Sequence, residues 1–92
     1  MKKRNVRYGN RVMIDLLSYL IENPDSNTLS ELPKKTGISK NSIYKALAIL
    51  GVDHIIEDYP VSSELSNIIQ LTEEGKSLAM AASLYRRLAR NL

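Results

Sequence analysis

The segment SKNSIYK, residues 39–45, gathers side chains that can recognise a nucleic acid. Asn41 carries an amide that can pair with an adenine edge through two hydrogen bonds, and Lys40 and Lys45 can bind guanine or phosphate. This chemistry is reversible hydrogen bonding and charge pairing, in which no covalent bond is made or broken. It requires the three side chains to point the same way, so one exposed face of a regular element has to carry them.

Hydroxyl groups in the same segment add to this candidate set. Ser39 and Ser42 can donate to phosphate oxygens near a helix start, where free backbone N–H groups also point. Tyr44 can donate to a phosphate or lie against a thymine methyl group. Basic residues before the segment and near the N-terminus supply further phosphate contacts. The candidate DNA-binding residues are Ser39, Lys40, Asn41, Ser42, Tyr44, Lys45, Lys34, Lys35, Arg4 and Arg7.

The apolar spacing of this stretch predicts a helix over residues 39–50, with Ser39 as its N-cap. Its inward face consists of Ile43, Ala46, Leu47 and Leu50, which recur at i, i+3, i+4 and i+7. Its outward side consists of Lys40, Asn41, Tyr44, Lys45 and Ala48, with Ser42 at the flank. Gly37 supplies the left-handed conformation that a tight turn between two helices needs. Ile38 is expected to fill the space between the two helices.

The helix before this turn contains Pro33, which would break a helix interior. Thr28 with Glu31 forms a capping box, but that start places Pro33 at the fifth helical position. Ser30 as N-cap places Pro33 at the third position, where no backbone donor is needed, and predicts a short helix over residues 31–36. The remaining alternative is a distorted or 3₁₀ first turn.

The first expected helix, residues 10–22, is apolar on most sides. Its polar residues form one narrow stripe of Arg11, Asp15, Ser18 and Glu22. A helix at the surface of a monomer usually has a wider polar face, so this helix is expected to be covered on more than one side. Pro24 ends it, because a proline disfavours helix for the residue before it.

The second half of the chain predicts a β-hairpin and a long helix. We expect strands over residues 54–59 and 67–71, joined by a loop over residues 60–66. Thr72 is the expected N-cap of a helix over residues 72–90, with acids in its first turn, where the helix dipole favours them. Its expected packing seam is Leu78, Ala81, Ala82, Tyr85, Leu88, Ala89 and Leu92.

Charge is distributed unevenly along the 92 residues, whose formal net charge is +3. Residues 1–12 carry basic groups and no acid, residues 46–75 carry acids and no lysine or arginine, and residues 76–92 are basic again. Basic ends of this kind can meet a polyanion. We expect residues 1–8 to form a flexible basic arm and residues 9–92 to form one domain.

The expected order of elements is helix, helix, helix, hairpin, helix, and its most specific stretches are ELPKKTGISKNSIYKAL and LTEEGKSLA. This chain resembles the winged helix-turn-helix domain of MarR-, ArsR- and PadR-like transcription regulators of bacteria and archaea. The resemblance covers about residues 10–90. It implies a mainly α fold with a small β-hairpin, and a sequence-specific regulator that reads double-stranded DNA with helix 39–50 in the major groove. It also implies that Pro33 occupies a position where these regulators commonly have a small residue.

The hairpin tip departs from that pattern. In such regulators this tip, the wing, often contacts DNA through arginine or lysine, whereas here residues 60–66 have no positive charge and Glu57, Asp58 and Glu64 lie in or beside the tip. Carboxylates facing phosphates are repelled. An acidic wing leaves open a rival function, a winged-helix protein-interaction module of a transcription or replication assembly.

Helices 10–22 and 72–90 carry more apolar surface than a small core covers, so they are expected to form a homodimer. The alternative is a monomer in which these two helices pack only on each other. No catalytic constellation or phosphate-binding loop is present, cysteine is absent, and His54 is the only histidine, so we expect no enzyme activity, no metal site and no cofactor. Ligand- or metal-gated regulation is a third, weaker alternative. No apolar run approaches the ~18–20 residues of a membrane span, which favours a cytoplasmic protein.

Overall fold

The computed structural model describes residues 10–24, 27–60 and 67–90. In this part of the chain the elements are α2 (Arg11–Glu22), α3 (Leu32–Thr36), α4 (Lys40–Val52), β1 (Ile56–Pro60), β2 (Asn67–Leu71) and α5 (Glu73–Arg90). The mainly α fold with one hairpin is confirmed. The expected basic arm and the tip of the hairpin, residues 61–66, lie outside the described residues.

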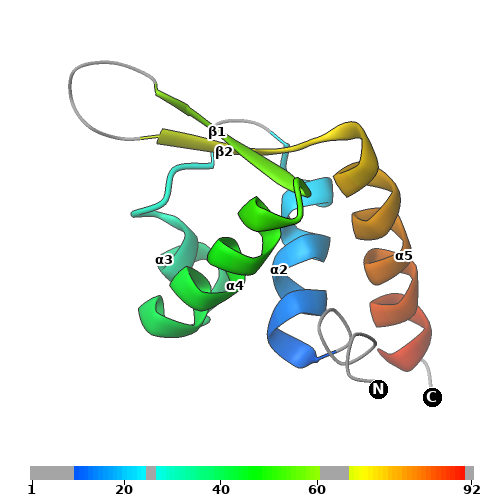
Figure 1. Ribbon diagram of the computed structural model, residues 1–92. Coiled ribbons are helices and arrows are strands. Elements are labelled where there is room, and N and C mark those ends of the chain that lie inside the picture. Colours follow the sequence, from blue (N-terminus) through cyan, green and yellow to red (C-terminus); the bar gives the residue numbers. More distant parts are fainter. Residues whose placement is uncertain (1–9, 25–26, 61–66, 91–92) are drawn as a thin grey trace, which may run out of the picture.

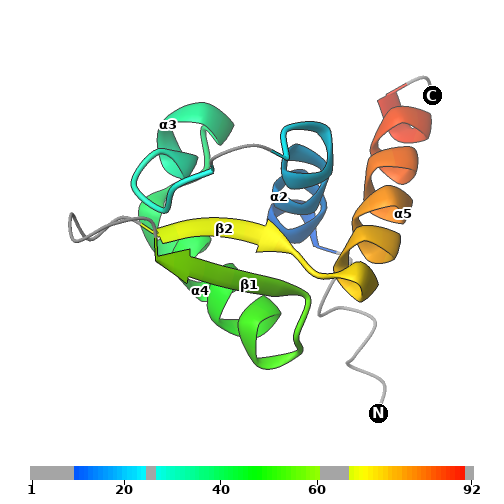
Figure 2. The same cartoon turned by 90° about the horizontal axis from the view of Figure 1, so that it is seen from above.

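Helix α2 lies at the centre of the molecule (Figure 1). It packs against α3 and α4 on one side and against α5 on the other, and it also meets β2 of the hairpin that crosses above it. Seen from above, α2 again lies between α3 and α5 (Figure 2). Asn10 caps the helix, because its side-chain oxygen accepts a hydrogen bond from the Met13 N–H at 3.0 Å. The predicted span and its end before Pro24 are confirmed.

The core forms where these elements converge on α2. Leu16, Leu17, Leu32, Ile43 and Leu50 are fully buried. The remaining buried apolar residues are Met13, Leu20, Ala46, Ile56, Ile69, Ala79 and Ala82. Every described element contributes to this cluster, so the described elements share one core. Among the described residues, no helix is long and apolar enough to span a bilayer.

The hairpin is antiparallel, with Ile56 opposite Leu71 and Tyr59 opposite Ile68. Strand β2 was predicted correctly, whereas β1 begins at Ile56, two residues later than expected. The reason is His54, whose φ of 60° places it in the left-handed region. The chain therefore still turns away from α4 at His54, and the Ile55 N–H bonds back to the Leu50 carbonyl at 2.8 Å.

A compact junction joins β2 to α5. The Thr72 N–H donates to the Ile55 carbonyl at 2.9 Å, and the Thr72 hydroxyl donates to the His54 carbonyl at 2.7 Å. The same hydroxyl oxygen accepts from the Gly75 N–H at 3.0 Å, which confirms Thr72 as the N-cap. Gly75 is buried against Ile55, and a Cβ on Gly75 would overlap the Ile55 carbonyl oxygen. The hairpin and α5 can approach this closely only because residue 75 has no side chain.

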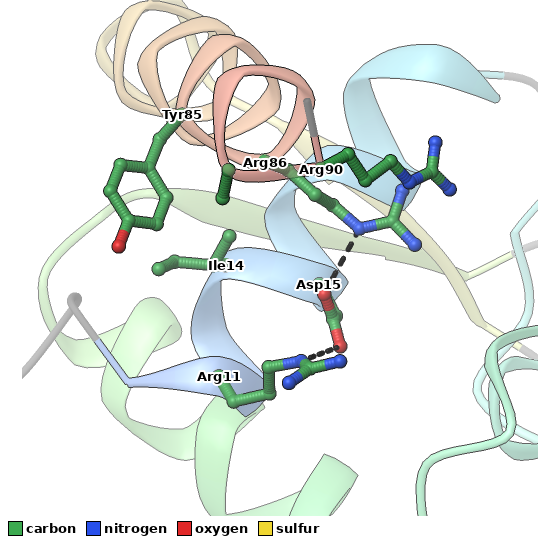
Figure 3. A pocket seen from close by; sticks show the side chains of 7 residues that line it. Arg11, Ile14, Asp15, Tyr85, Arg86 and Arg90 are labelled. Atoms are coloured by element: carbon green, nitrogen blue, oxygen red, sulfur yellow. Dashed lines mark hydrogen bonds and ion pairs between the residues drawn. The ribbon is translucent and has the colours of Figure 1, made fainter. Parts of the chain in front are cut away.

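The polar stripe of α2 lies beside α5, with Ser18 buried, Asp15 half-buried, and Arg11 and Glu22 exposed at its two ends. Asp15 accepts a hydrogen bond from Arg86 at 3.1 Å (Figure 3), and Glu22 accepts one from the Ser83 hydroxyl at 2.8 Å. Ser18 lies between them in the sequence and is buried, with its hydroxyl unpaired among the described residues. The narrow stripe predicted that α2 is covered on several sides, and the structure confirms this.

Most residues of the predicted α5 seam do not pack within the chain. The side facing α2 buries Gly75, Ala79, Ala82 and Ser83, whereas Ala81, Tyr85, Leu88 and Ala89 are exposed. Small side chains occupy this face because the two helices pack closely. As a result, the larger apolar residues of α5 point outward.

We predict that Gly75→Ala lowers the free energy of unfolding by roughly 1–3 kcal/mol, because the new methyl group overlaps backbone that cannot move independently. Urea denaturation of both proteins measures the change. Gly51→Ala is the matched control: this glycine lies in α4 with open space around its Cβ position, and alanine there is expected to stabilise by up to about 1 kcal/mol. A Gly75→Ala protein as stable as the native chain would contradict the close approach.

Candidate nucleic-acid interface

The turn between α3 and α4 is built around Gly37. Its φ is 77°, in the left-handed region that glycine enters at little cost. The Gly37 N–H bonds to the Pro33 carbonyl at 3.0 Å, and the Ile38 N–H bonds to the Thr36 hydroxyl at 3.1 Å. Ile38 is half-buried against the core, as expected for a residue between two helices. The predicted turn is therefore confirmed.

Helix α3 starts later than either predicted cap would place it. It begins at Leu32 after a turn in which the Leu32 N–H bonds to the Thr28 carbonyl at 3.2 Å. Glu31 occupies the N-cap position without a side-chain cap, so Ser30 is not the N-cap. Pro33 thus falls in the first helical turn, where its missing N–H would have no partner anyway. The third alternative, a distorted first turn, comes nearest to the structure.

Helix α4 begins with the predicted cap. The Ser39 hydroxyl oxygen accepts from the Ser42 N–H at 3.2 Å, and the two hydroxyls lie 3.0 Å apart. The helix runs to Val52, two residues beyond its predicted end. Ile43, Ala46 and Leu50 are buried and Leu47 is half-buried. The inward face therefore fixes how the helix is rotated about its axis.

The outward side of α4 is exposed as predicted. Lys40, Asn41, Tyr44, Lys45 and Ala48 are exposed, and Ser42 is half-buried. The Lys40 ammonium lies 5.8 Å from the centre of the Tyr44 ring, at cation–π distance. Among the described residues, neither Lys40 nor Lys45 is in an ion pair. These cations are therefore available to an external anion.

The other candidate cations are placed less uniformly. Lys34 and Lys35 are exposed on α3, and Lys35 pairs with Glu31 at 3.4 Å. Both lie within four residues of Gly37, so they flank the same turn as the start of α4. Arg4 and Arg7 fall outside the described residues, so their predicted role remains a prediction.

This arrangement recurs in solved structures. A transcriptional regulator homologue from Pyrococcus horikoshii is 16% identical, with 94% of this chain and 88% of that chain covered and a TM-score of 0.72. HlyU from Vibrio cholerae is 20% identical, with 92% and 83% covered and a TM-score of 0.68. MepR from Staphylococcus aureus, solved with DNA, is 21% identical with a TM-score of 0.71; 85% of this chain and 59% of MepR are covered.

The chain has the winged helix-turn-helix fold. At these identities the likeness is one of fold, and the chain spans less than two thirds of the length of MepR. No family model and no curated protein sequence matches the chain. In this fold α4 occupies the position called the recognition helix, and β1–β2 the position called the wing.

The wing carries an exposed carboxylate at Glu57, at the second position of β1. The wing tip, residues 60–66, has no lysine or arginine in the sequence, and its residues 61–66 lie outside the described residues. Glu57 is adjacent to Ile56, which is buried and faces α4, so Glu57 lies on the opposite face of the hairpin.

The sequence did not reveal an apolar groove beside the recognition helix. The groove, of about 580 Å³, is lined by Leu29, Tyr44, Leu47, Ala48, Gly51, Ile56 and Ile69. It follows the C-terminal half of α4, where the exposed side consists of Ala48, Gly51 and Val52. In the sequence, the spacing of these three residues at i, i+3 and i+4 indicates that they share one side of the helix. Polar side chains suited to nucleic acid are therefore confined to the first two turns of α4.

We predict that Ser39→Ala lowers the free energy of unfolding by about 1 kcal/mol, because the first turn of α4 loses its cap. Ser30→Ala serves as the comparison, since Ser30 is exposed and does not cap α3; its effect should stay within about 0.5 kcal/mol. Urea denaturation of the two variants gives both values. Equal losses would show that α3 begins at the Ser30 cap after all.

Proposed function

We propose that this protein is a transcription regulator that binds double-stranded DNA as a dimer, with the start of α4 in the major groove. The observation that carries the proposal is the set of polar and basic side chains on the first two turns of α4. They are exposed, they share one side, and their cations have no ion-pair partner among the described residues.

Each residue has a distinct role in this proposal. Asn41 reads an adenine edge and gives sequence specificity, while Lys40 and Lys45 bind guanine or phosphate. Ser39, Ser42 and the free N–H groups of the first turn hold a phosphate. Lys34 and Lys35 bind the backbone beside the turn, and Arg4 and Arg7 extend this contact along the DNA. Tyr44 supports Lys40 and contacts the backbone or a thymine methyl group.

The dimer is proposed from the outer side of α5. Met80, Leu84, Tyr85 and Leu88 are each between 56% and 62% exposed, on a helix that already packs on α2. Exposed apolar residues gathered on one side of a helix mark a contact surface more often than scattered ones do. Ile14 and Ile21 of α2 are only half-buried and extend this surface. Two-fold pairing would present the two α4 helices to successive major grooves, about 34 Å apart.

The solved structures support this proposal by analogy. MepR is described as a regulator of a multidrug efflux pump and has been solved with DNA. MepR and this chain share a fold, and a shared fold does not by itself imply a shared ligand. DNA binding by this chain is therefore part of the proposal.

A protein-interaction module is the second candidate function. The exposed Glu57 and the apolar groove between α4 and the hairpin favour it, because neither suits a phosphate backbone. Mobility-shift titration on random duplex DNA at low and moderate salt separates the two functions. A DNA regulator binds at low salt and loses affinity steeply as salt rises, since phosphate contacts release counterions. Absence of binding at low salt favours the interaction module.

We predict that Lys40→Ala and Lys45→Ala each weaken DNA binding by about tenfold. Each change should also make the salt dependence shallower, by about 0.9 in slope for every phosphate that the variant no longer neutralises. Lys76→Ala is the charge-matched control: this lysine lies on α5 and pairs with Glu73. Its DNA affinity should stay within twofold of the native protein. If all three variants behave alike, only net charge matters and α4 is not the reading element.

We also predict that Leu84→Asp combined with Leu88→Asp yields a folded monomer, because two carboxylates cannot be buried at the α5 interface without partners. Sedimentation velocity measures the change, and circular dichroism checks that the helices remain. Val52→Asp is the control, since Val52 is 73% exposed at the far end of α4. An unchanged dimer in the double variant would move the interface away from α5.

A further inference from the structure

The exposed side of α4 changes from polar to apolar along its length. Its first two turns carry lysines and Asn41, whereas Ala48 and Gly51, which follow, are exposed and have no polar side-chain group. The ring of Tyr44 is next to them, and this residue is 42% exposed. Tyr44, Ala48 and Gly51 follow one another at spacings of four and three, so they form one apolar stripe along the helix.

Ala48 lies at the middle of the exposed side of α4. The buried residues Ile43, Ala46 and Leu50 define the inward face of the helix, and Ala48 falls about opposite them. Asn41 is seven residues earlier, so it lies within about 20° of Ale48 around the helix axis. A helix that is docked with Asn41 towards the base edges therefore brings the alanine towards base edges too.

Discussion

Helix α2 packs between α5 and the helix-turn-helix, and the position of each relative to the other depends on it. Leu16 and Leu17 are adjacent in sequence and both fully buried, so the helix is covered over a wide arc. Burial of a leucine side chain contributes roughly 1.5–3 kcal/mol, and α2 buries three leucines and a methionine. A domain of this size has little other core, so the loss of α2 packing would separate the recognition helix from α5.

Local signals explain why α4 could be predicted from the sequence. The Ser39 cap, the left-handed Gly37 and the apolar repeat from Ile43 to Leu50 each act within one or two helical turns. The α5 face was predicted wrongly because its fit is set by a partner far away in the chain. Gly75 and Ser83 do not register as hydrophobic, yet they are buried because α2 and the hairpin come close. The late start of β1 depends on His54 in a conformation that its residue type does not announce.

The charges of the described chain contribute less to stability than to surface character. The pairs Arg11–Asp15, Lys35–Glu31 and Lys76–Glu73 all involve well-exposed side chains. Exposed pairs of this kind contribute about 0–1 kcal/mol each. Cations that remain unpaired, at the start of α4 and the end of α5, are therefore better explained by external anions than by folding. The sequence showed their signs and spacing, but not that they form two separate surfaces.

The missing side chain at Gly75 has a consequence for distance. It lets α5 leave the hairpin in contact with the Ile55 carbonyl, which sets the direction of an 18-residue helix. Such a helix is about 27 Å long, so a small change of angle at its first turn moves its far end by several ångströms. If two chains pair through α5, this one glycine helps to set how far apart their recognition helices stand. The spacing of the two halves of a DNA site would then be determined at a residue that touches neither the DNA nor the partner chain.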